Sequence, residues 1–367
     1  GGGGYGRFGG TQHGEMPPPN GQGQIRSPLR NDMQQEYEDR SPLPPRPRSV
    51  PLFAALNYQA VIKDLQSLPP NERALLLQAL RWRLMKSTGR QRQLVLATLV
   101  QNDMLQPAIV SACLHSDDPS VVEQTVRLLN HFASFSAGRA YILSKDGLLQ
   151  QLCALMLKEN TDSPSRQNVL GALQKLSLRR GPQSAMIDGG VIGWLAKALA
   201  DTDSLSEYTI EYATALLMNL SLRLAGKRAC EDPALDILSV LNTLLEYDNG
   251  QVRTYVNGTL YSVLTRPSLR ERALEMGLPD ILEALLAHSD EMNRRQVQYI
   301  LPLLTADVPQ IDPAVEAQVE EADEAEEEED YDDDDEEEVA TPAPVARGRG
   351  RGRGRTAPTA RGGRGGR

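Results

Sequence analysis

An all-α superhelical solenoid with disordered N- and C-terminal tails is the fold class that this sequence predicts, and three observations lead to it. Residues 52–310 carry apolar side chains three and four positions apart, as on one face of a helix, and no stretch alternates as a strand would. Matching features recur about every 43 residues along this region, which is typical of stacked helical repeats. Glycine and proline are concentrated outside it, in residues 1–50 and 341–367.

The repeat is visible first as a series of equivalent helix starts. Four positions that precede an apolar run lie 43, 43 and 44 residues apart: Gly147, Gly190, Pro233 and Gly277. A leucine stands five residues after each of them: Leu152, Leu195, Leu238 and Leu282. Acidic turns recur at similar spacing, at Asp117, Asp162, Asp203, Asp248 and Asp290. Asp, Ser and Asn side chains in these turns can accept hydrogen bonds from the first N–H groups of the next helix.

The helix after each turn has core positions in register. One apolar column comprises Leu129, Leu173, Leu217, Leu260 and Leu301. A second, three positions later on the same helix face, comprises Phe132, Leu176, Leu220, Val263 and Leu304. A third column contains the small residues Gly171, Ala215 and Gly258, which let neighbouring helices approach closely. The segments ALQKLS and LLMNLS, at 172–177 and 216–221, resemble the third helix of armadillo repeats, so the predicted solenoid is of the armadillo type.

The chain is therefore expected to have five parts. These are a Gly/Pro-rich tail at 1–50, a helical cap at 51–100, armadillo-like repeats at 101–310, an acidic segment at 311–340 and an Arg-Gly tail at 341–367. The first and the last two are predicted to be disordered, because their composition cannot bury enough apolar surface. Trp82 is expected to pack within the cap.

A candidate binding site follows from the concave face, which the third helices of armadillo repeats line. Its six polar residues are Lys175, Arg179, Asn219, Arg223, Ser262 and Arg266. Each arginine follows its partner by four positions, which places the two on one helix face and predicts a basic groove for an acidic extended segment. The alternative is that the arginines only offset the dipole of the last helical turn. Another five residues are either partner contacts or interhelical packing: Tyr208, Tyr212, Tyr255, Asn257 and Tyr261.

The sequence contains no catalytic constellation. It has no HExxH, P-loop or GxSxG motif, so the protein is predicted not to be an enzyme and to need neither a cofactor nor a metal ion. Cys113, Cys153 and Cys230 have no CxxC spacing and are predicted to be buried apolar residues. No apolar run approaches the ~18 residues that a membrane span requires, so no membrane insertion is expected.

Charge is concentrated near the C-terminus. Residues 316–338 carry 17 acidic side chains and no basic ones, whereas residues 341–367 carry 8 arginines and no acids. Arginine on a glycine-rich backbone can contact phosphates without a fixed fold, which supports an alternative function, an RNA-binding or nuclear adaptor that binds nucleic acid through the Arg-Gly tail. A second alternative is a general armadillo adaptor of signalling or adhesion.

Three strings carry a resemblance to a known family. They are LLLQALRWRLMKS at 75–87, SLSEYTIEYATALLMNLSLRLAGKRAC at 204–230 and YVNGTLYSVLTRPSLRERALEMG at 255–277. These strings resemble the LisH-domain-containing armadillo-repeat proteins of cilia, and the likeness covers about residues 55–305. The LisH segment expected upstream is absent from this sequence, so we expect a C-terminal fragment or a diverged relative.

The resemblance implies a non-enzymatic scaffold at cilia and basal bodies. The locations that it implies are the cilium, including its tip, the basal body, the cytoplasm and the cytoskeleton. The partners that it implies are a TOG-domain tubulin-binding protein and tubulin itself. The implied role is control of the length or stability of axonemal microtubules, and none of this follows from the repeat period alone.

Overall fold

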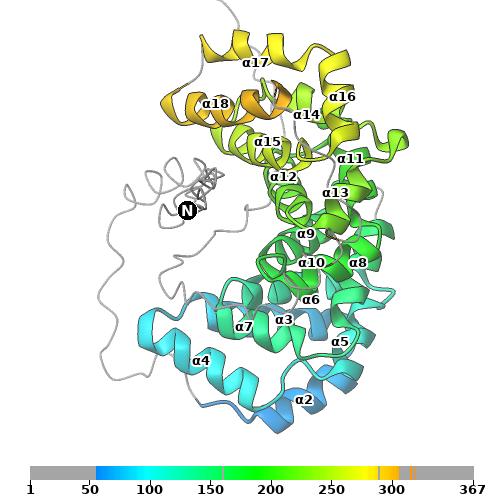
Figure 1. Cartoon of the computed structure of the whole chain (residues 1–367). Coiled ribbons are helices and arrows are strands. Elements are labelled where there is room, and N and C mark those ends of the chain that lie inside the picture. The colour runs from blue at the N-terminus through cyan, green and yellow to red at the C-terminus, as the bar shows by residue number, and fades with distance from the viewer. Residues whose placement is uncertain (1–54, 159–160, 288–289, 306–314, 316–317, 319–367) are drawn as a thin grey trace, which may run out of the picture.

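The computed structural model describes residues 55–158, 161–287 and 290–305, together with positions 315 and 318. Within these residues every regular element is a helix, and the helices stack into one curved solenoid (Figure 1). The tails predicted at the two ends of the chain lie outside the described residues, apart from positions 315 and 318. Their predicted disorder therefore stays a prediction.

The described helices form an opening pair and then repeated triplets. The opening pair is α2 (Tyr58–Ser67) and α3 (Pro70–Met85). The first helices of the triplets are α4 (Gly89–Gln101), α7 (Ser136–Leu143), α10 (Arg180–Asp188), α13 (Leu224–Cys230) and α16 (Pro267–Glu275). The second helices are α5 (Pro107–Leu114), α8 (Leu148–Lys158), α11 (Val191–Leu199), α14 (Ile237–Leu244) and α17 (Leu278–Leu286). The third helices are α6 (Pro119–Ala133), α9 (Pro164–Leu176), α12 (Glu207–Ser221), α15 (Gly250–Val263) and α18 (Glu291–Thr305).

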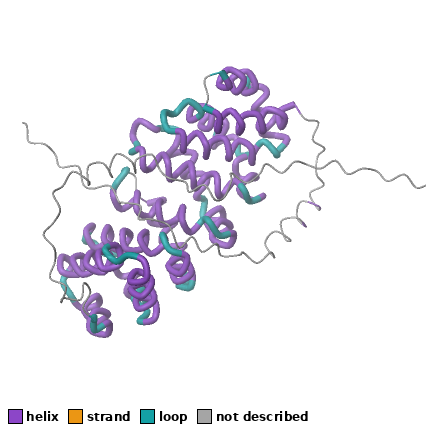
Figure 2. The backbone as a smooth tube through the Cα atoms, turned by 90° about the vertical axis from the view of Figure 1, so that its left-hand side faces the viewer, coloured by secondary structure: helices purple, strands orange, loops and turns teal. Residues whose placement is uncertain are grey.

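The third helices form the spine of the solenoid. Helix α3 packs on α6, and α6, α9, α12, α15 and α18 then pack each on the next. In Figure 1 this spine curves around an inner, concave side, while α5, α8, α13 and α16 lie toward the outer side. The view from the side in Figure 2 shows the same helices in successive layers. Helix α4 packs against α7 as a first helix does, although it falls within the predicted cap at 51–100.

The predicted leucine columns form the core. Leu129, Leu173, Leu217 and Leu260 are fully buried, and Leu301 in the last third helix is half-buried. The second column, from Phe132 to Leu304, is buried throughout. Side chains three positions apart on each third helix therefore seal it against its neighbours, as the period predicted.

The turns before the third helices supply the expected caps. In five repeats an oxygen of a turn residue accepts a hydrogen bond from a backbone N–H of the helix that follows. The capping residues are Asp118, Ser163, Ser206, Asn249 and Asp290. Capping by Asp, Ser and Asn in these turns is thus confirmed, although most caps stand one to three residues after the aspartates that marked the turns.

Two sequence expectations are wrong in detail. Helix α14 begins at Ile237 and not at Pro233, because Pro233–Leu235 forms a 3-10 turn and Asp236, with φ of 42°, precedes the helix. The other helix starts follow a left-handed glycine at the predicted positions. Trp82 does not pack within the cap, since its side chain is 49% exposed. Helix α3 buries Leu80 and Leu84, and position 82 lies on the opposite face of the helix.

Candidate functional site

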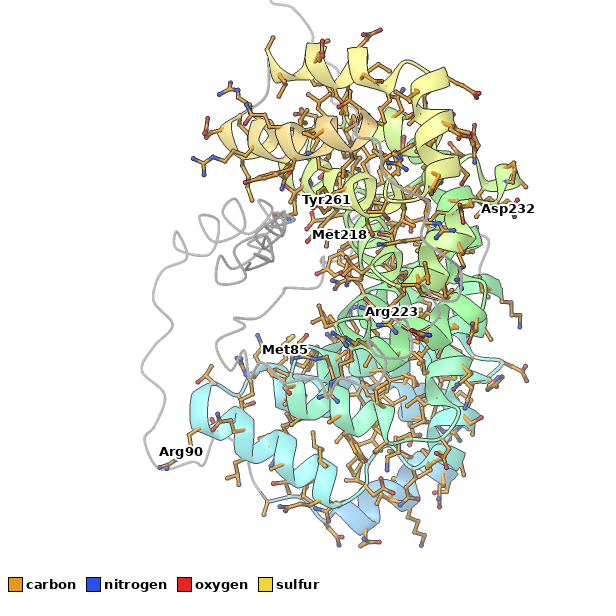
Figure 3. All side chains as sticks on the ribbon, viewed as in Figure 1. Met85, Arg90, Met218, Arg223, Asp232 and Tyr261 are labelled. Carbon is orange, nitrogen blue, oxygen red and sulfur yellow. The ribbon has the colours of Figure 1, made fainter. Side chains whose placement is uncertain are left out.

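The concave side of the solenoid is lined by side chains of the third helices. Met85, Met218 and Tyr261 lie along this side in Figure 3, whereas Asp232 lies on the opposite side of the molecule. A curved row of equivalent helices offers an extended surface of the kind that solenoid proteins use for binding. The concave face is therefore the candidate binding surface of the solenoid.

The polar column of the predicted site ties each third helix to the one before it. The Lys175 ammonium group donates to Asn130 Oδ1 and to Ser134 Oγ, at 2.9 Å each. The Asn219 amide donates to Ser177 Oγ at 2.9 Å. The three predicted residues of this column, Lys175, Asn219 and Ser262, are buried, with 5–8% of their surface exposed. Their polar groups therefore form hydrogen bonds between repeats.

Ser262, the third member, continues the same pattern. Its hydroxyl donates to the backbone carbonyl of Ser221, 2.5 Å away. That carbonyl belongs to the last turn of α12, where carbonyl groups have no partner within their own helix. The column is therefore a ladder of hydrogen bonds that runs from one third helix to the next.

The three arginines of the predicted site are not in the third helices. Arg179, Arg223 and Arg266 are the N-cap residues of α10, α13 and α16, beyond the last turns of α9, α12 and α15. The expectation that each lies on one helix face with its partner four residues earlier is wrong, because the helix ends before the arginine. The alternative, that the arginines offset the dipole of the last turn, stays a prediction, although each arginine stands just beyond that turn.

The environments of these arginines differ along the solenoid. Arg223 is 3% exposed, and Arg266 forms an ion pair with Glu231 at 3.1 Å. The structure thus divides the six predicted residues into a buried ladder and a set of turn residues, and it does not bring them together as one stripe. Their role in binding an acidic segment stays a prediction.

The tyrosines singled out from the sequence pack mainly within the solenoid. The rings of Tyr208 and Tyr212 stack with centroids 4.2 Å apart and an angle of 23° between their planes. Tyr255 and Asn257 are buried, while Tyr261 is half-buried on the concave side. Packing thus accounts for the first four, and Tyr261 is left as the candidate contact.

The small-residue column has a specific use. A Cβ atom at Gly258 would lie 2.7 Å from the Met218 sulfur, and a Cβ atom at Gly171 would collide with the Tyr208 hydroxyl. Each glycine thus leaves room on its own helix for a side chain of the neighbouring helix α12. At both positions the space is taken by a side chain and not by the neighbouring helix backbone, so the predicted close approach of the helices themselves stays a prediction. Met218 lies on the concave side in Figure 3.

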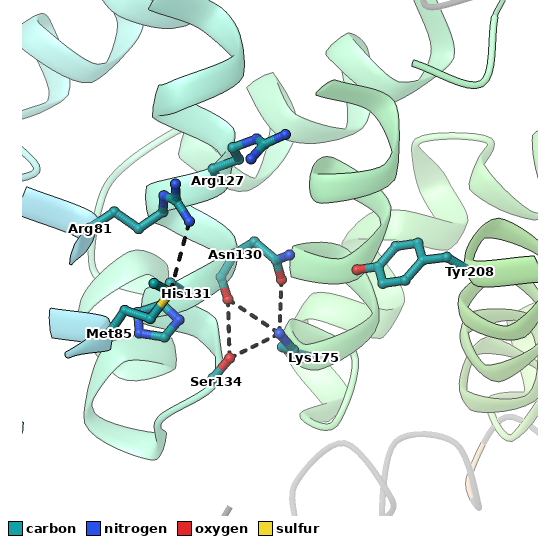
Figure 4. A pocket seen from close by; sticks show the side chains of 8 residues that line it. All are labelled: Arg81, Met85, Arg127, Asn130, His131, Ser134, Lys175 and Tyr208. Atoms are coloured by element: carbon teal, nitrogen blue, oxygen red, sulfur yellow. Dashed lines mark hydrogen bonds between the residues drawn. The ribbon is translucent and has the colours of Figure 1, made fainter. Parts of the chain in front are cut away.

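A small pocket with several cationic side chains lies at the N-terminal end of this face, between α3, α6, α9 and α12 (Figure 4). We call it the cationic pocket. Its lining residues are Arg81, Met85, Arg127, Asn130, His131, Ser134, Lys175 and Tyr208. Figure 4 shows these side chains converging from four helices, with Lys175 at the centre of a hydrogen-bonded group.

The electrostatics of the cationic pocket are dominated by positive charge. Arg127 pairs with Glu123 at 2.9 Å. Burial lowers the pKa of His131 to about 3, and the charges of Lys175, Arg81 and Arg92 act in the same direction. The imidazole is therefore neutral at neutral pH, and the surrounding side chains carry the charge.

Sequence reasoning missed most of this pocket. It identified Lys175 as a site residue and Tyr208 as either a partner contact or a packing residue, but it did not identify Arg81, Arg127 or His131 as site residues. One signal was available, since Arg127 occupies the repeat position that the small residue Gly171 occupies one repeat later. Arg81 gives no such signal, because it lies in α3, outside the regular repeat, and meets the pocket only through the fold.

Other kinds of site are not supported by the part of the chain that the structure describes. Among these residues no cluster of His, Cys, Asp and Glu could hold a metal ion. None of their helices combines the length and the apolar character needed to cross a membrane. The three cysteines are buried, as predicted, and burial raises the pKa of the Cys153 thiol to about 11 and of the Cys230 thiol to about 12.

Comparison with known proteins supports the resemblance inferred from the three strings. A profile of the family described as "LisH domain-containing protein ARMC9, ARM repeats" matches residues 186–305. LisH domain-containing protein ARMC9 of Danio rerio is 44% identical over 277 residues, which cover 74% of this chain and 34% of that protein. The Homo sapiens protein of the same name is 43% identical over 270 residues, or 72% of this chain and 33% of that protein. This chain thus spans about a third of the length of the curated relatives it matches.

Solved structures confirm the armadillo-type fold. The designed armadillo repeat protein YIII(Dq)4CqI aligns with a TM-score of 0.56 at 18% identity, over 68% of this chain and all 100% of that chain. The designed armadillo repeat protein YIII(Dq.V1)4CPAF, in complex with peptide (KR)4, aligns with a TM-score of 0.55 at 17% identity over the same shares. At such low identity the likeness concerns the fold alone.

Proposed function

We propose, from the premise that the armadillo-repeat region of this chain belongs to the family of LisH domain-containing protein ARMC9, that the protein is a non-enzymatic scaffold of cilia and basal bodies. It binds microtubule-associated partners and helps to control the length or stability of axonemal microtubules. Its locations are the cilium, including the tip, and the basal body, within the cytoplasm and cytoskeleton. Its partners are a TOG-domain tubulin-binding protein and tubulin.

The observation that carries the proposal is the extent of the likeness, which runs over 277 residues, or 74% of this chain. The concave row of third helices supports protein partners in general, because solenoids bind along such faces. A designed armadillo neighbour is in complex with a peptide, which favours the same use of the fold. The cilium, the TOG-domain partner and tubulin rest on the family resemblance alone.

Imaging of the tagged full chain in a ciliated cell line tests the location. We expect signal at the basal body and along the cilium, including its tip. The tag alone should give no signal at these places. Capture of the tagged chain after mild crosslinking should enrich tubulin and a TOG-domain protein. Depletion followed by measurement of axoneme length tests the role, and a nuclear location with normal axonemes would overturn the ciliary proposal.

The alternative, an RNA-binding or nuclear adaptor, is tested with the same chain lacking residues 347–367. If the Arg-Gly tail binds RNA, this deletion should abolish the binding, and the affinity of the intact chain should fall steeply with salt. A deletion that leaves RNA and microtubule binding unchanged would remove the tail from both functions.

A further inference from the structure

We propose that the cationic pocket binds a carboxylate side chain of an acidic protein segment that lies along the concave face. The proposal rests on the proposed function, since it assumes that this face binds protein partners. Its basis is a set of three buried nitrogen atoms without a hydrogen-bond partner among the described residues: Arg81 Nε, Arg127 Nε and His131 Nε2. A buried polar group without a partner costs free energy. Because the Nε–H groups of Arg81 and Arg127 can only donate, they favour an acceptor supplied from outside.

Arg81 carries the largest part of the argument. Its side chain is 5% exposed, and its hydrogen bond within the pocket goes to the Met85 sulfur at 4.0 Å, a weak acceptor. Burial lowers the pKa of Arg81, the charge of Arg127 lowers it further, and Glu123 acts in the opposite direction. Because Glu123 is already paired with Arg127, a second carboxylate beside Arg81 would offset the remaining repulsion.

Lys175 is held in position for the same ligand. Its ammonium group is fixed by Asn130 Oδ1 and Ser134 Oγ, both neutral oxygens, at 2.9 Å. These hydrogen bonds orient the ammonium group, and its charge acts on His131 in the same pocket. The site is thus built before any ligand arrives, which lowers the cost of binding.

The size of the pocket and its surroundings select the class of ligand. The cavity measures about 20 Å³, which is room for one or two water-sized atoms, such as the oxygens of a carboxylate. Farther along the concave side lie Met218 and Tyr261, whose side chains offer apolar contact area beside the pocket. Nucleic acid would need a continued track of cations to follow its phosphates, whereas a peptide needs one charged contact and an apolar surface beside it.

The pKa of His131 can serve as a probe of ligand binding in the unmodified protein. The charged and titratable groups that face it or border the pocket are Arg81 on α3, Arg92 on α4, Glu123 and Arg127 on α6, Lys175 on α9 and Tyr208 on α12. A carboxylate bound among them would stabilise the imidazolium form and raise the pKa of His131 from its value of about 3. If Arg81 only stabilised the fold and no carboxylate entered the pocket, the pKa of His131 would not rise.

Fluorescence anisotropy of a labelled octaglutamate peptide, titrated with the full chain, is the first test. Arg81→Gln should weaken binding about fivefold to tenfold at low salt, as expected for the loss of one charge-assisted contact. Arg81→Lys should recover part of the lost affinity. The matched control is Arg90→Gln, which removes the same charge from an exposed residue and leaves the Arg-Gly tail intact. Equal binding by the Arg81→Gln and Arg90→Gln variants overturns the proposal.

Nuclear magnetic resonance of the unmodified chain is the second test and does not depend on a variant of Arg81 that folds. His131→Gln identifies the His131 signal among the 4 histidines of the chain. Saturating octaglutamate should raise the pKa of His131, and an unchanged pKa overturns the proposal. The same titration is made with a phosphoserine peptide and with a single-stranded RNA oligomer. If RNA alone shifts His131, the pocket is a nucleic-acid site and the peptide proposal is wrong.

Failure of this inference can be separated from failure of the proposed function. If Arg81→Gln leaves octaglutamate binding unchanged but the tagged chain still reaches cilia and captures its partners, only the pocket assignment is wrong. If the chain is absent from cilia while His131 responds to the peptide, the pocket stands and the ciliary scaffold does not.

Discussion

The hydroxyl of Tyr208 lies over Gly171, in the space that a side chain at position 171 would occupy. The two residues belong to neighbouring third helices, α12 and α9, and a Cβ atom at position 171 would also come within 3.1 Å of the Asn130 amide group. The glycine therefore positions Tyr208 at the edge of the cationic pocket. Gly171, which the sequence suggested only as a site of close helix packing, thus also leaves room for Tyr208, a side chain of the cationic pocket.

Gly171→Ala should destabilise the fold by about 1–3 kcal/mol, because the added methyl group overpacks a buried site. The free energy of unfolding, measured by denaturant melts, checks this. Tyr208→Phe removes the hydroxyl that the methyl group meets. In that background the cost of Gly171→Ala should be smaller, and the two changes should therefore couple in a double-mutant cycle.

Gly181→Ala is the matched control. Position 181 is an exposed helical glycine with no atom near its Cβ position, so alanine there should be neutral or slightly stabilising. If Gly171→Ala and Gly181→Ala have the same effect, the fitted pair of Gly171 and Tyr208 has no energetic importance.

Leu217→Ala and Leu260→Ala should each cost about 2–5 kcal/mol, as buried leucine truncations do. Both side chains are fully buried in the first leucine column. Leu222→Ala is the matched control, since Leu222 is 57% exposed and its truncation should change stability by less than about 0.5 kcal/mol. Three similar losses in thermal or denaturant melts would contradict the burial of the column.

The leucine columns were predictable because burial on a helix face repeats with the helical period and leaves a mark at every repeat. Trp82 was not, since one aromatic residue on an amphipathic helix does not say which face is covered. The arginine positions failed for another reason. Arg223 follows Asn219 by four positions, but α12 ends at Ser221, and a helix end cannot be located to within a residue from spacing.

The cationic pocket shows where prediction from the sequence stops. Lys175 was found because it belongs to a column with a regular spacing. Its acceptors Asn130 and Ser134 lie 45 and 41 residues away, in the previous repeat, and no local pattern marks them as partners. Arg81 comes from a helix outside the repeat. Contacts of this kind depend on how layers are stacked and not on the pattern within a layer.

Asp162→Asn should destabilise the protein at neutral pH, because Asp162 joins two repeats. Its carboxylate accepts from the Ser206 backbone N–H at 2.7 Å and from Thr209 Oγ1 at 2.6 Å, and it pairs with Arg166 at 3.2 Å. We expect a loss of about 1–3 kcal/mol in the free energy of unfolding.

The pH dependence of that loss has a definite sign. Burial raises the pKa of Asp162, but hydrogen bonds from Thr209 and Ser206 outweigh it and leave the pKa below its usual value. A depressed folded pKa contributes stability above the unfolded value of about 3.9, and this contribution is lost as pH falls through the folded pKa. The difference between the unmodified chain and Asp162→Asn should therefore shrink in acid. Asp203→Asn, at an exposed turn position, should have little effect at either pH.

The ion pair between Arg266 and Glu231 separates a structural role of Arg266 from the binding role predicted for it. Arg266→Glu places two carboxylates where Nε and Oε2 now lie 3.1 Å apart, and it should lower stability by about 0.5–1 kcal/mol, since both side chains are partly exposed. The double variant Arg266→Glu with Glu231→Arg keeps the net charge and should restore stability. Octaglutamate binding by the double variant then decides between the two roles. We expect it to match that of the unmodified chain, because Arg266 lies in the turn before α16 and is already paired. Weaker peptide binding by a double variant of normal stability would instead place Arg266 in the binding groove.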